Sequence, residues 1–298
     1  MNNDAKAWGD FWAKNAGGNA NGCLPDRWAA IEEAQQGAWR SFIRDLPDGA
    51  DVLDLATGDG RVLKWMHAER DDLVLSGIDL APEIPPAPSG TTTQGGVSME
   101  DLPFEDEAFD AVVSQFGFEY GDISAVASEI TRVLKDGGKV GLMVHRGDGP
   151  ILEHNQARRT AIEWALEEKK VSELVTNALK APGGGPAIAA QVAAAIALLG
   201  ANKFGESSPA WEIPEALRRA CIMGQRSGTS SVLNTVQAIK DQAGNEIGRI
   251  ASLARACAAA DARPEMNEAF AKSGLNPIST NPVKEPSGRA IADFLTFG

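Results

Sequence analysis

A short glycine-containing segment, residues 54–60 (Asp-Leu-Ala-Thr-Gly-Asp-Gly), constrains the fold of this chain more than any other feature. It follows a short apolar strand and precedes a helix-like segment, Arg61–Met66. A second apolar stretch, Leu73–Ile78, then ends at another acid, Asp79. Strand, glycine turn, helix, strand and acid in this order are typical of the nucleotide-binding half of a doubly wound sheet. The sequence therefore predicts a ligand site at the carboxyl ends of these two strands.

The charge of the glycine turn indicates which ligand it suits. A dinucleotide fingerprint needs a third glycine where Leu63 stands, and it relies on a helix N-terminus that holds a pyrophosphate. Here two carboxylates, Asp54 and Asp59, flank the turn instead. Such a turn suits S-adenosylmethionine (SAM), which carries a sulfonium, an amino group and a ribose but no phosphate. Asp79, at a strand end, can accept hydrogen bonds from both ribose hydroxyls.

At these residues the chain resembles the class I SAM-dependent methyltransferases, whose first motif reads roughly D-x-G-x-G-x-G. Asp54, Gly58 and Gly60 match this motif, whereas Ala56 replaces its first glycine. The resemblance implies SAM as the cofactor and S-adenosylhomocysteine as the product.

Two later segments extend the resemblance to roughly residues 45–146. Residues 97–104 (Val-Ser-Met-Glu-Asp-Leu-Pro-Phe) are similar to the D-A-x-x-L-P-F pattern of the small-molecule, methyltransferase type 11-like branch, and Phe109–Val112 is similar to its F-D-x-V pattern. In the family the acid of the first pattern contacts the adenine amino group, a place that Ser98 or Glu100 is expected to fill here. The cofactor-binding residues implied by the resemblance are Asp54, Ala56, Thr57, Gly58, Gly60, Asp79, Leu80, Ser98, Met99, Glu100, Gln115 and Phe116.

The order of elements predicts an α/β domain with a large insertion. Residues 51–146 alternate between strand and helix signals, which favours a parallel sheet with helices on both faces. Residues 150–263 are rich in Ala and Leu at helical spacing, and residues 264–298 return to one helix and two strands. The expected fold is a Rossmann-like, mostly parallel seven-stranded sheet with an antiparallel C-terminal hairpin. Its expected parts are an N-terminal helical segment (1–50), the SAM-binding domain (51–149 and 264–298) and the helical insertion (150–263).

Two segments outside the sheet bear on the methyl acceptor. The insertion leaves a central strand after His145, so we expect it to form a cap over the carboxyl ends of the strands and to line the acceptor pocket. Its apolar stretch Ala187–Leu199 also suits a homodimer interface. In the N-terminal segment, the aromatic residues Trp8, Phe11 and Trp12 either pack on the sheet or close over the cofactor.

Composition narrows the partners and the location. The net charge is −13 and no extended Lys/Arg cluster occurs, which disfavours a nucleic-acid substrate. The three cysteines are far apart, with no metal-ligand spacing and no disulfide framework. The N-terminus shows no signal-peptide pattern, and the 13-residue apolar run 187–199 is too short to span a membrane. We therefore expect a cytoplasmic enzyme that uses no metal and contacts no membrane.

The chemistry asks little of the protein beyond alignment. Methyl transfer from a sulfonium is an in-line displacement with a good leaving group, and a base is needed only when the acceptor loses a proton. His145 is the only histidine expected at the carboxyl end of a central strand, so it is the first candidate for that base. Glu119, Tyr120 and His154 are the further catalytic candidates. Each of the four alternatively serves as an ordinary buried hydrogen-bonding group.

The predicted function is methyl transfer from SAM to an oxygen, nitrogen or sulfur atom of a small molecule. Two alternatives from other classes stay open. The chain methylates a protein or peptide held by the insertion, or it binds SAM without catalysis. No motif in the N-terminal segment or the insertion identifies the acceptor.

Overall fold

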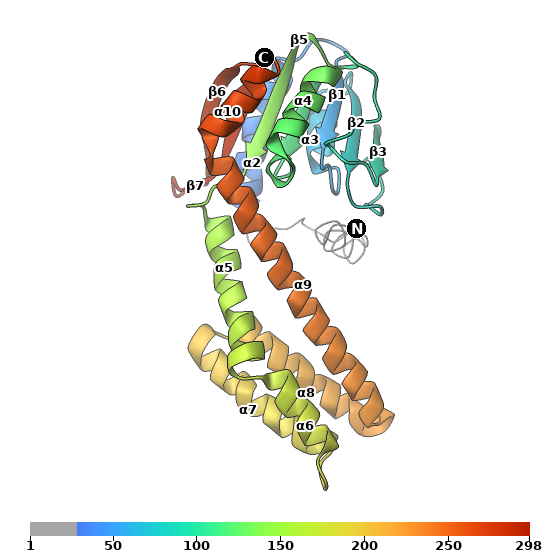
Figure 1. Cartoon of the computed structure of the whole chain (residues 1–298), viewed down its shortest axis with the longest axis vertical. Coiled ribbons are helices and arrows are strands. Elements are labelled where there is room, and N and C mark those ends of the chain that lie inside the picture. Colours follow the sequence, from blue (N-terminus) through green and yellow to red (C-terminus); the bar gives the residue numbers. More distant parts are fainter. Residues whose placement is uncertain (1–28) are drawn as a thin grey trace. The chain divides into compact units, whose positions relative to one another are not determined.

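The computed structural model describes residues 29–298, which form two compact units (Figure 1). Unit 1 contains the described residues up to Leu152 together with Ser252–Gly298. Unit 2 contains Glu153–Ala251 and lies within the range 150–263 expected for the insertion. The glycine turn belongs to unit 1, so the cofactor site is described from that unit alone.

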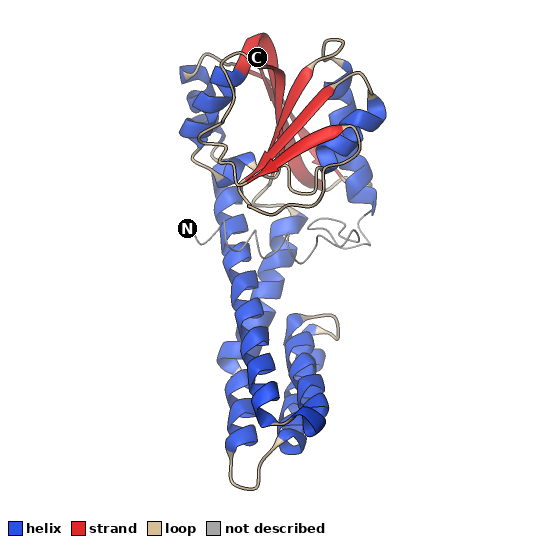
Figure 2. Ribbon diagram, turned by 90° about the vertical axis from the view of Figure 1, so that its right-hand side faces the viewer, coloured by secondary structure: helices blue, strands red, loops and turns tan. Residues whose placement is uncertain are grey.

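Unit 1 is built around a seven-stranded sheet with the strand order β3-β2-β1-β4-β5-β7-β6. Strands β1 to β5 pair in parallel, whereas β7 lies antiparallel between β5 and β6. Figure 2 draws the strands of this sheet in red. The expected Rossmann-like sheet with an antiparallel C-terminal hairpin is thus confirmed. The strand bounds are β1 Asp51–Leu55, β2 Val74–Asp79, β3 Thr91–Gly95, β4 Phe109–Gln115, β5 Leu134–Val144, β6 Pro277–Lys284 and β7 Ala290–Phe297.

Helices cover both faces of this sheet. One face packs against α2 (Ala29–Arg44) and α3 (Arg61–Glu69), and the other against α4 (Ile123–Val133) and α10 (Arg263–Lys272). In β1, Val52 faces the first pair of helices, while Leu53 faces the second pair. Parallel strands buried on both faces are apolar throughout, which is why these strands appear in the sequence as short apolar runs.

The strand order places the switch point of the sheet between β1 and β4. Asp54 pairs with Gly77 of β2 on one side and with Val113 of β4 on the other. The chain crosses to β2 and β3 in one direction and to β4 and β5 in the other. Ligands of doubly wound sheets bind beyond the carboxyl ends of the strands at this point. The end of β1 is therefore where a site is expected.

Three strands show what periodicity misses. β3 consists of Thr, Gln and Gly at the sheet edge and carries no apolar signal. In β5 the residues Lys135–Gly138 form an irregularity, where the pairing with β4 shifts register. β6 continues past Pro282 to Lys284, which is tolerated because β6 is an edge strand and its proline need not donate a hydrogen bond.

The N-terminal part of the chain is described only from Ala29 onward. There α2 buries Ile31, Trp39 and Phe42 against the sheet, and Ala34 and Ala38 pack against the same core. The expected packing or lid role of Trp8, Phe11 and Trp12 lies outside the described residues.

Unit 2 is helical, and no strand occurs among its residues. Its core buries small side chains such as Ala189 and Ala193 against Leu217 and Cys221. The helices are α6 (Val171–Lys180), α7 (Pro186–Phe204) and α8 (Pro209–Ser227), with the π-helix η3 (Trp164–Glu168) and parts of α5 (Pro150–Glu163) and α9 (Thr229–Asp261). The helical insertion expected from the Ala/Leu pattern is confirmed.

Helix α7 corrects the argument from the apolar run. The helix is 19 residues long, from Pro186 to Phe204, and its length and composition are those of a helix able to cross a membrane. The helix extends beyond the 13-residue apolar run, so the length of that run does not exclude a membrane-spanning helix. In the structure 33% of an 18-residue window of α7 is buried, mainly through its alanines in the core of unit 2. The absence of membrane contact stays a prediction.

Candidate functional site

The turn after β1 has an unusual backbone. Ala56, Gly58 and Gly60 all have positive φ, at 55°, 54° and 69°. Glycine adopts this left-handed region at little cost, whereas alanine is strained there. Ala56 thus adopts a backbone conformation that favours glycine, at the place where the resembled motif has its first glycine. The turn is tied to β2 by the Thr57 N–H, which donates to the carbonyl oxygen of Ile78 at 2.8 Å.

Asp79 holds the turn from the end of β2. Its Oδ2 accepts the N–H of Gly58 at 2.9 Å, and its Oδ1 accepts the N–H of Ala81 at 2.9 Å. The carboxylate therefore joins the glycine turn to the loop after β2. Each oxygen accepts one hydrogen bond here and retains a second lone pair for a ligand hydroxyl.

Asp54 is the other buried acid of the turn. Its Oδ2 accepts the Thr57 hydroxyl at 2.7 Å. Burial raises the pKa of Asp54 to about 8, and the neighbouring carboxylates of Asp79 and Asp59 add to the rise, while the Thr57 hydroxyl opposes it. Burial also raises the pKa of Asp79. Both acids are held in surroundings where a positively charged group would stabilise their ionised forms.

Asp59 plays a different part from the one its charge suggested. Its carboxylate accepts the backbone N–H of Arg61 and pairs with the Arg61 guanidinium, both at 3.2 Å. Asp59 is therefore paired with Arg61, the first residue of α3. Among the three acids of this site, Asp54 and Asp79 are the two buried ones, and no salt bridge joins either to a cationic side chain of the described residues.

These residues fit SAM in their chemistry. Two buried carboxylates face a turn whose backbone is freed by Gly58 and Gly60, and a Cβ on Gly60 would come within 2.6 Å of the Pro88 side chain. The polar groups suit a ligand with a ribose and a positive charge. A phosphate would be repelled by the same acids.

The ends of β1 and β4 approach each other closely beside this turn. The Ser114 hydroxyl donates to the carbonyl oxygen of Leu55 at 2.9 Å and accepts the N–H of Phe118 at 3.0 Å. A Cβ added to Gly117 would overlap the Cβ of Ala56. Glycine at 117 thus makes room for alanine at 56.

Gln115, predicted as a cofactor contact, is paired with α2. Its amide oxygen accepts the indole N–H of Trp39 at 2.7 Å, and its amide nitrogen donates to Gln35 at 3.3 Å. Neither Gln35 nor Trp39 was among the predicted site residues. A signal for Gln35 existed, because it is a polar residue on the apolar stripe of α2 that includes Ile31 and Trp39.

The end of β5 carries a buried pair, His145 and Glu119. The Oε1 atom of Glu119 lies 2.7 Å from His145 Nδ1 and accepts the backbone N–H of His145 at 2.9 Å. Phe116 lies against the imidazole with ring centroids 4.2 Å apart, and Tyr120 presents its ring edge at 6.0 Å. Three of the four predicted catalytic residues therefore meet at one place. The fourth, His154, belongs to unit 2.

The segment expected at the adenine folds as a turn. The N–H of Glu100 donates to the Ser98 hydroxyl at 3.2 Å, and Oε1 of Glu100 accepts the N–H of Asp122 at 2.8 Å. Met99 packs against the core, and Leu80, after β2, is largely exposed. Ser98 and Glu100 thus hold the backbone, and their contact with adenine stays a prediction.

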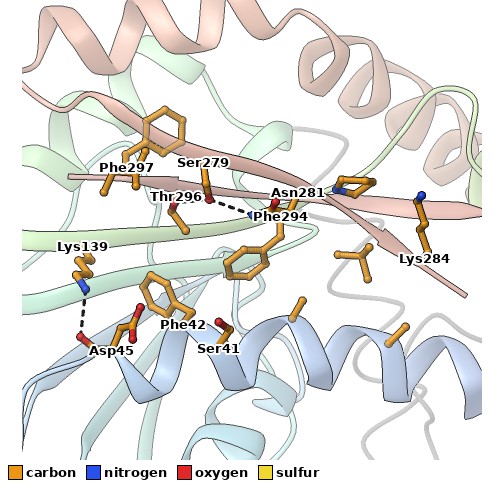
Figure 3. A pocket seen from close by; sticks show the side chains of 15 residues that line it. Ser41, Phe42, Asp45, Lys139, Ser279, Asn281, Lys284, Phe294, Thr296 and Phe297 are labelled. Carbon is orange, nitrogen blue, oxygen red and sulfur yellow. Dashed lines mark hydrogen bonds between the residues drawn. The ribbon is translucent and has the colours of Figure 1, made fainter.

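A groove of about 530 Å³ lies elsewhere in unit 1, between α2 and the β6–β7 hairpin (Figure 3). It is lined by Phe42, Phe294 and Lys139, among others, and Lys139 donates to the carbonyl oxygen of Asp45 at 3.1 Å. Lys139 is in the middle of β5, whereas His145 follows its carboxyl end, and no residue of the turn after β1 lines the groove. The groove is therefore separate from the cofactor site. Among residues 29–298, no group of three or more His, Cys, Asp or Glu side chains is arranged to hold a metal ion.

Comparison with known proteins agrees with this geometry. Residues 53–142 match the family model described as a methyltransferase domain. The chain therefore carries a methyltransferase domain, as its motifs predicted.

Relatives and solved structures match less than half of the chain. An uncharacterised protein of Mycobacterium tuberculosis is 31% identical over 103 residues, which cover 32% of this chain and 37% of that protein. The ubiquinone/menaquinone biosynthesis C-methyltransferase of Geotalea daltonii is 34% identical over 118 residues, covering 35% of this chain and 50% of that protein. The solved geranyl diphosphate C-methyltransferase of Streptomyces coelicolor A3(2) is 18% identical, with a TM-score of 0.33, over 39% of this chain and 44% of that one. The chain thus spans half or less of the length of these proteins.

Proposed function

We propose that this chain transfers a methyl group from SAM to an oxygen, nitrogen or sulfur atom of a small molecule. The observation that carries the proposal is the pair of buried acids, Asp54 and Asp79, around a positive-φ glycine turn inside a methyltransferase domain. When bound, SAM supplies an electrophilic methyl group on a sulfonium. Asp79 would hold the ribose, and the backbone at Gly58 and Gly60 would lie along the cofactor.

The chain's own contribution is placement. Displacement at a sulfonium methyl needs little more than alignment of the attacking atom, because the leaving group is good. The turn after β1 would hold the cofactor. Polar and aromatic side chains for the acceptor would come from the residues after β4 and β5, namely Phe116, Glu119, Tyr120 and His145.

The first test is cofactor binding by calorimetry with SAM and S-adenosylhomocysteine. Gly58→Val should abolish binding, because a branched side chain at φ 54° strains the turn and blocks the cofactor backbone contacts. Asp48→Asn is the control, since Asp48 is a fully exposed acid that pairs with Arg70 on the surface. A folded wild-type chain that binds neither compound would reject the proposal.

The second test identifies the acceptor class by release of S-adenosylhomocysteine. A panel of small alcohols, amines and thiols addresses the main proposal. Carbon acceptors belong in the panel as well, because the Geotalea relative is named a C-methyltransferase. Recovery of a labelled protein from lysate with radioactive SAM would favour a protein or peptide acceptor. Tight SAM binding without turnover on any acceptor would favour a non-catalytic role.

The proposal includes a cytoplasmic location, a helical cap formed by residues 150–263 over the acceptor, and a homodimer. Buried reduced thiols at Cys221 and Cys257 support the first, and the exposed leucines Leu198 and Leu199 of α7 support the last. Cell fractionation tests the location, and light scattering tests the dimer. Crosslinking of a photoreactive acceptor analogue into residues 150–263 tests the cap.

A further inference from the structure

The strongest unassigned feature of unit 1 is the way His145 is held. His145 follows β5, and Glu119 lies in the short 3-10 helix η2 (Phe118–Tyr120) after β4. Both side chains are buried, with exposed fractions of 8% for His145 and 0% for Glu119. The imidazole has Glu119 at one nitrogen, Phe116 along one face and the Tyr120 ring edge nearby. These contacts restrict the ring to one orientation.

The shared oxygen of Glu119 determines which nitrogen of His145 carries the proton. Oε1 accepts the backbone N–H of His145 at 2.9 Å, so this atom is already a hydrogen-bond acceptor. The same atom lies 2.7 Å from Nδ1. An oxygen that accepts one N–H and retains a lone pair is best matched by a second N–H. The proton therefore lies on Nδ1, and Nε2 keeps a free lone pair.

The second carboxylate oxygen of Glu119, Oε2, has surroundings that are unusual for a residue with only a structural role. Oε2 is buried and has no hydrogen-bond partner within residues 29–298. A buried carboxylate oxygen without a partner is destabilising, and such groups are uncommon in folded proteins. A neutral amide would satisfy the two N–H donors of His145 equally well. The negative charge itself is therefore the property that needs a reason.

A charge beside the imidazole has a direct chemical use. When Nε2 takes up a proton, the ring becomes a cation, and the neighbouring carboxylate stabilises that cation. Cys257 does not compete for the proton, because burial, with the charges of Glu119 and Asp261, raises the pKa of its thiol to about 12. Nε2 itself makes no hydrogen bond to any residue between 29 and 298 and stays available to a ligand.

We propose that Glu119 is a positioning residue that holds His145 as the Nδ1–H tautomer, and that His145 Nε2 accepts a proton from the methyl acceptor. This assignment rests on the proposed methyltransferase function. It restricts the acceptor to groups that lose a proton on methylation, such as a hydroxyl, thiol or amine. The proton of the acceptor forms a bond with Nε2, the acceptor atom keeps the electron pair for its new bond to the methyl group, and the proton on Nε2 later passes to water.

The tautomer can be observed without any substrate. The chain has only three histidines, so selective ¹⁵N labelling of the imidazole rings yields few signals. A His145→Gln variant assigns the signals of His145 by their loss. We expect the neutral ring of wild type to show a protonated Nδ1 and an unprotonated Nε2. A protonated Nε2 in the neutral ring would overturn the proposal.

Two substitutions of Glu119 separate orientation from charge. Glu119→Gln should keep the Nδ1–H tautomer, because the atom that accepts the backbone N–H of His145 must be the amide oxygen. Glu119→Met should lose the tautomer preference. The control is Glu129→Gln on α4, which neutralises a carboxylate bonded to Arg132 and to the N–H of Leu102. An unchanged tautomer in Glu119→Met would overturn the positioning role.

Turnover and cofactor affinity complete the test. With an acceptor that loses a proton, Glu119→Gln and His145→Gln should each lower kcat by about 10²-fold, with SAM affinity within twofold of wild type. Full turnover in both variants would overturn the base role. If SAM fails to bind the wild type, the proposed function fails, whereas the tautomer measurement still reports on the pair by itself.

Discussion

The two halves of the carboxyl edge of the sheet use buried carboxylates in different ways. At the ends of β1 and β2, Asp54 accepts a threonine hydroxyl and Asp79 accepts two backbone N–H groups. At the ends of β4 and β5, one oxygen of Glu119 serves the backbone and the ring of a single histidine, His145. Asp54 and Asp79 therefore hold the turn after β1 and the loop after β2, whereas Glu119 holds one histidine by both its backbone and its ring.

The difference matches what each half would have to do. A cofactor would be held largely by backbone groups of the turn, whose shape Gly58, Gly60 and Asp79 maintain. An acceptor differs from one enzyme to the next, and the residues near it are side chains that can be exchanged without altering the turn. The four predictions below test this division.

The largest expected effect is a pH dependence of stability caused by Asp54. The folded chain holds this proton up to about pH 8, whereas the unfolded chain releases it near the ordinary value of 3.8. Between these values the folded state binds the extra proton, so the free energy of unfolding falls as pH rises, by about 1.4 kcal/mol per unit and about 6 kcal/mol in all. Asp54→Asn should remove the part of this slope that Asp54 causes and leave a smaller fall from Asp79, whose pKa burial also raises. Urea unfolding at pH 5, 6, 7 and 8 without SAM measures it.

A matched control for Asp54 lies at the opposite end of the sheet. Lys135 lowers the pKa of Asp110 by its hydrogen bond, so the stabilisation from Asp110 is present above its unfolded pKa and is lost only at acid pH. Asp110→Asn should keep the fall from pH 5 to 8. Parallel curves for wild type and Asp54→Asn would contradict the assignment. Binding of a cationic cofactor should also release a proton at neutral pH, which calorimetry in two buffers of different ionisation enthalpy detects.

Removal of the Asp79 carboxylate should weaken both the turn and cofactor binding. Asp79→Ala leaves the N–H groups of Gly58 and Ala81 without their partner, and it leaves the ribose hydroxyls unpaired. We expect SAM affinity to fall by roughly 1–3 kcal/mol, with a loss of stability of similar size. Calorimetry and urea unfolding measure the two effects. An unchanged SAM affinity in a folded variant would show that Asp79 does not bind the cofactor. If stability falls while affinity is unchanged, Asp79 only holds the turn.

The contact between the two halves can be tested by a pair of small substitutions. Gly117→Ala places a Cβ against that of Ala56 and should destabilise the chain by about 1–2 kcal/mol. Ala56→Gly removes the nearest atom that this Cβ would meet, leaving Ser114 Oγ at 3.0 Å and the Leu55 carbonyl oxygen at 3.3 Å, and it relieves the strain at φ 55°. The double variant should therefore recover most of the loss, which a double-mutant cycle by thermal or urea unfolding measures. Additive effects would show that the two residues do not interact.

The smallest effect is expected at Ser98, on the cofactor side. Ser98→Asp restores the acid that the resembled family has at this place, and it retains an acceptor for the N–H of Glu100. One added charge-assisted hydrogen bond should strengthen SAM binding by about 1 kcal/mol, or roughly fivefold. His145→Gln should leave this affinity unchanged. Weaker binding in Ser98→Asp would show that the adenine lies against other residues.

Some of this site could be predicted because it is local in sequence. The acids Asp54 and Asp79, the glycines between them and the strands before them form a pattern that is complete within about thirty residues. The same holds for the helices of unit 2, whose breaks fall at Pro and Gly. Backbone geometry links such short-range patterns to structure with few alternatives.

The rest was decided by contacts between distant segments. Nothing in the sequence indicates that Glu119 meets His145, that Gln115 is bonded to Trp39, or that Gly117 makes room for Ala56. Each pair joins different elements that meet only when β1, β4, β5 and α2 are packed together. The edge strand β3, with no apolar residue, likewise forms only because β2 offers it a partner. Sequence alone therefore determined the class of fold and the cofactor turn, because both follow from local periodicity and backbone freedom. Only the tertiary structure decided the partner of each polar side chain, because a hydrogen bond depends on which atoms the packed chain brings within reach.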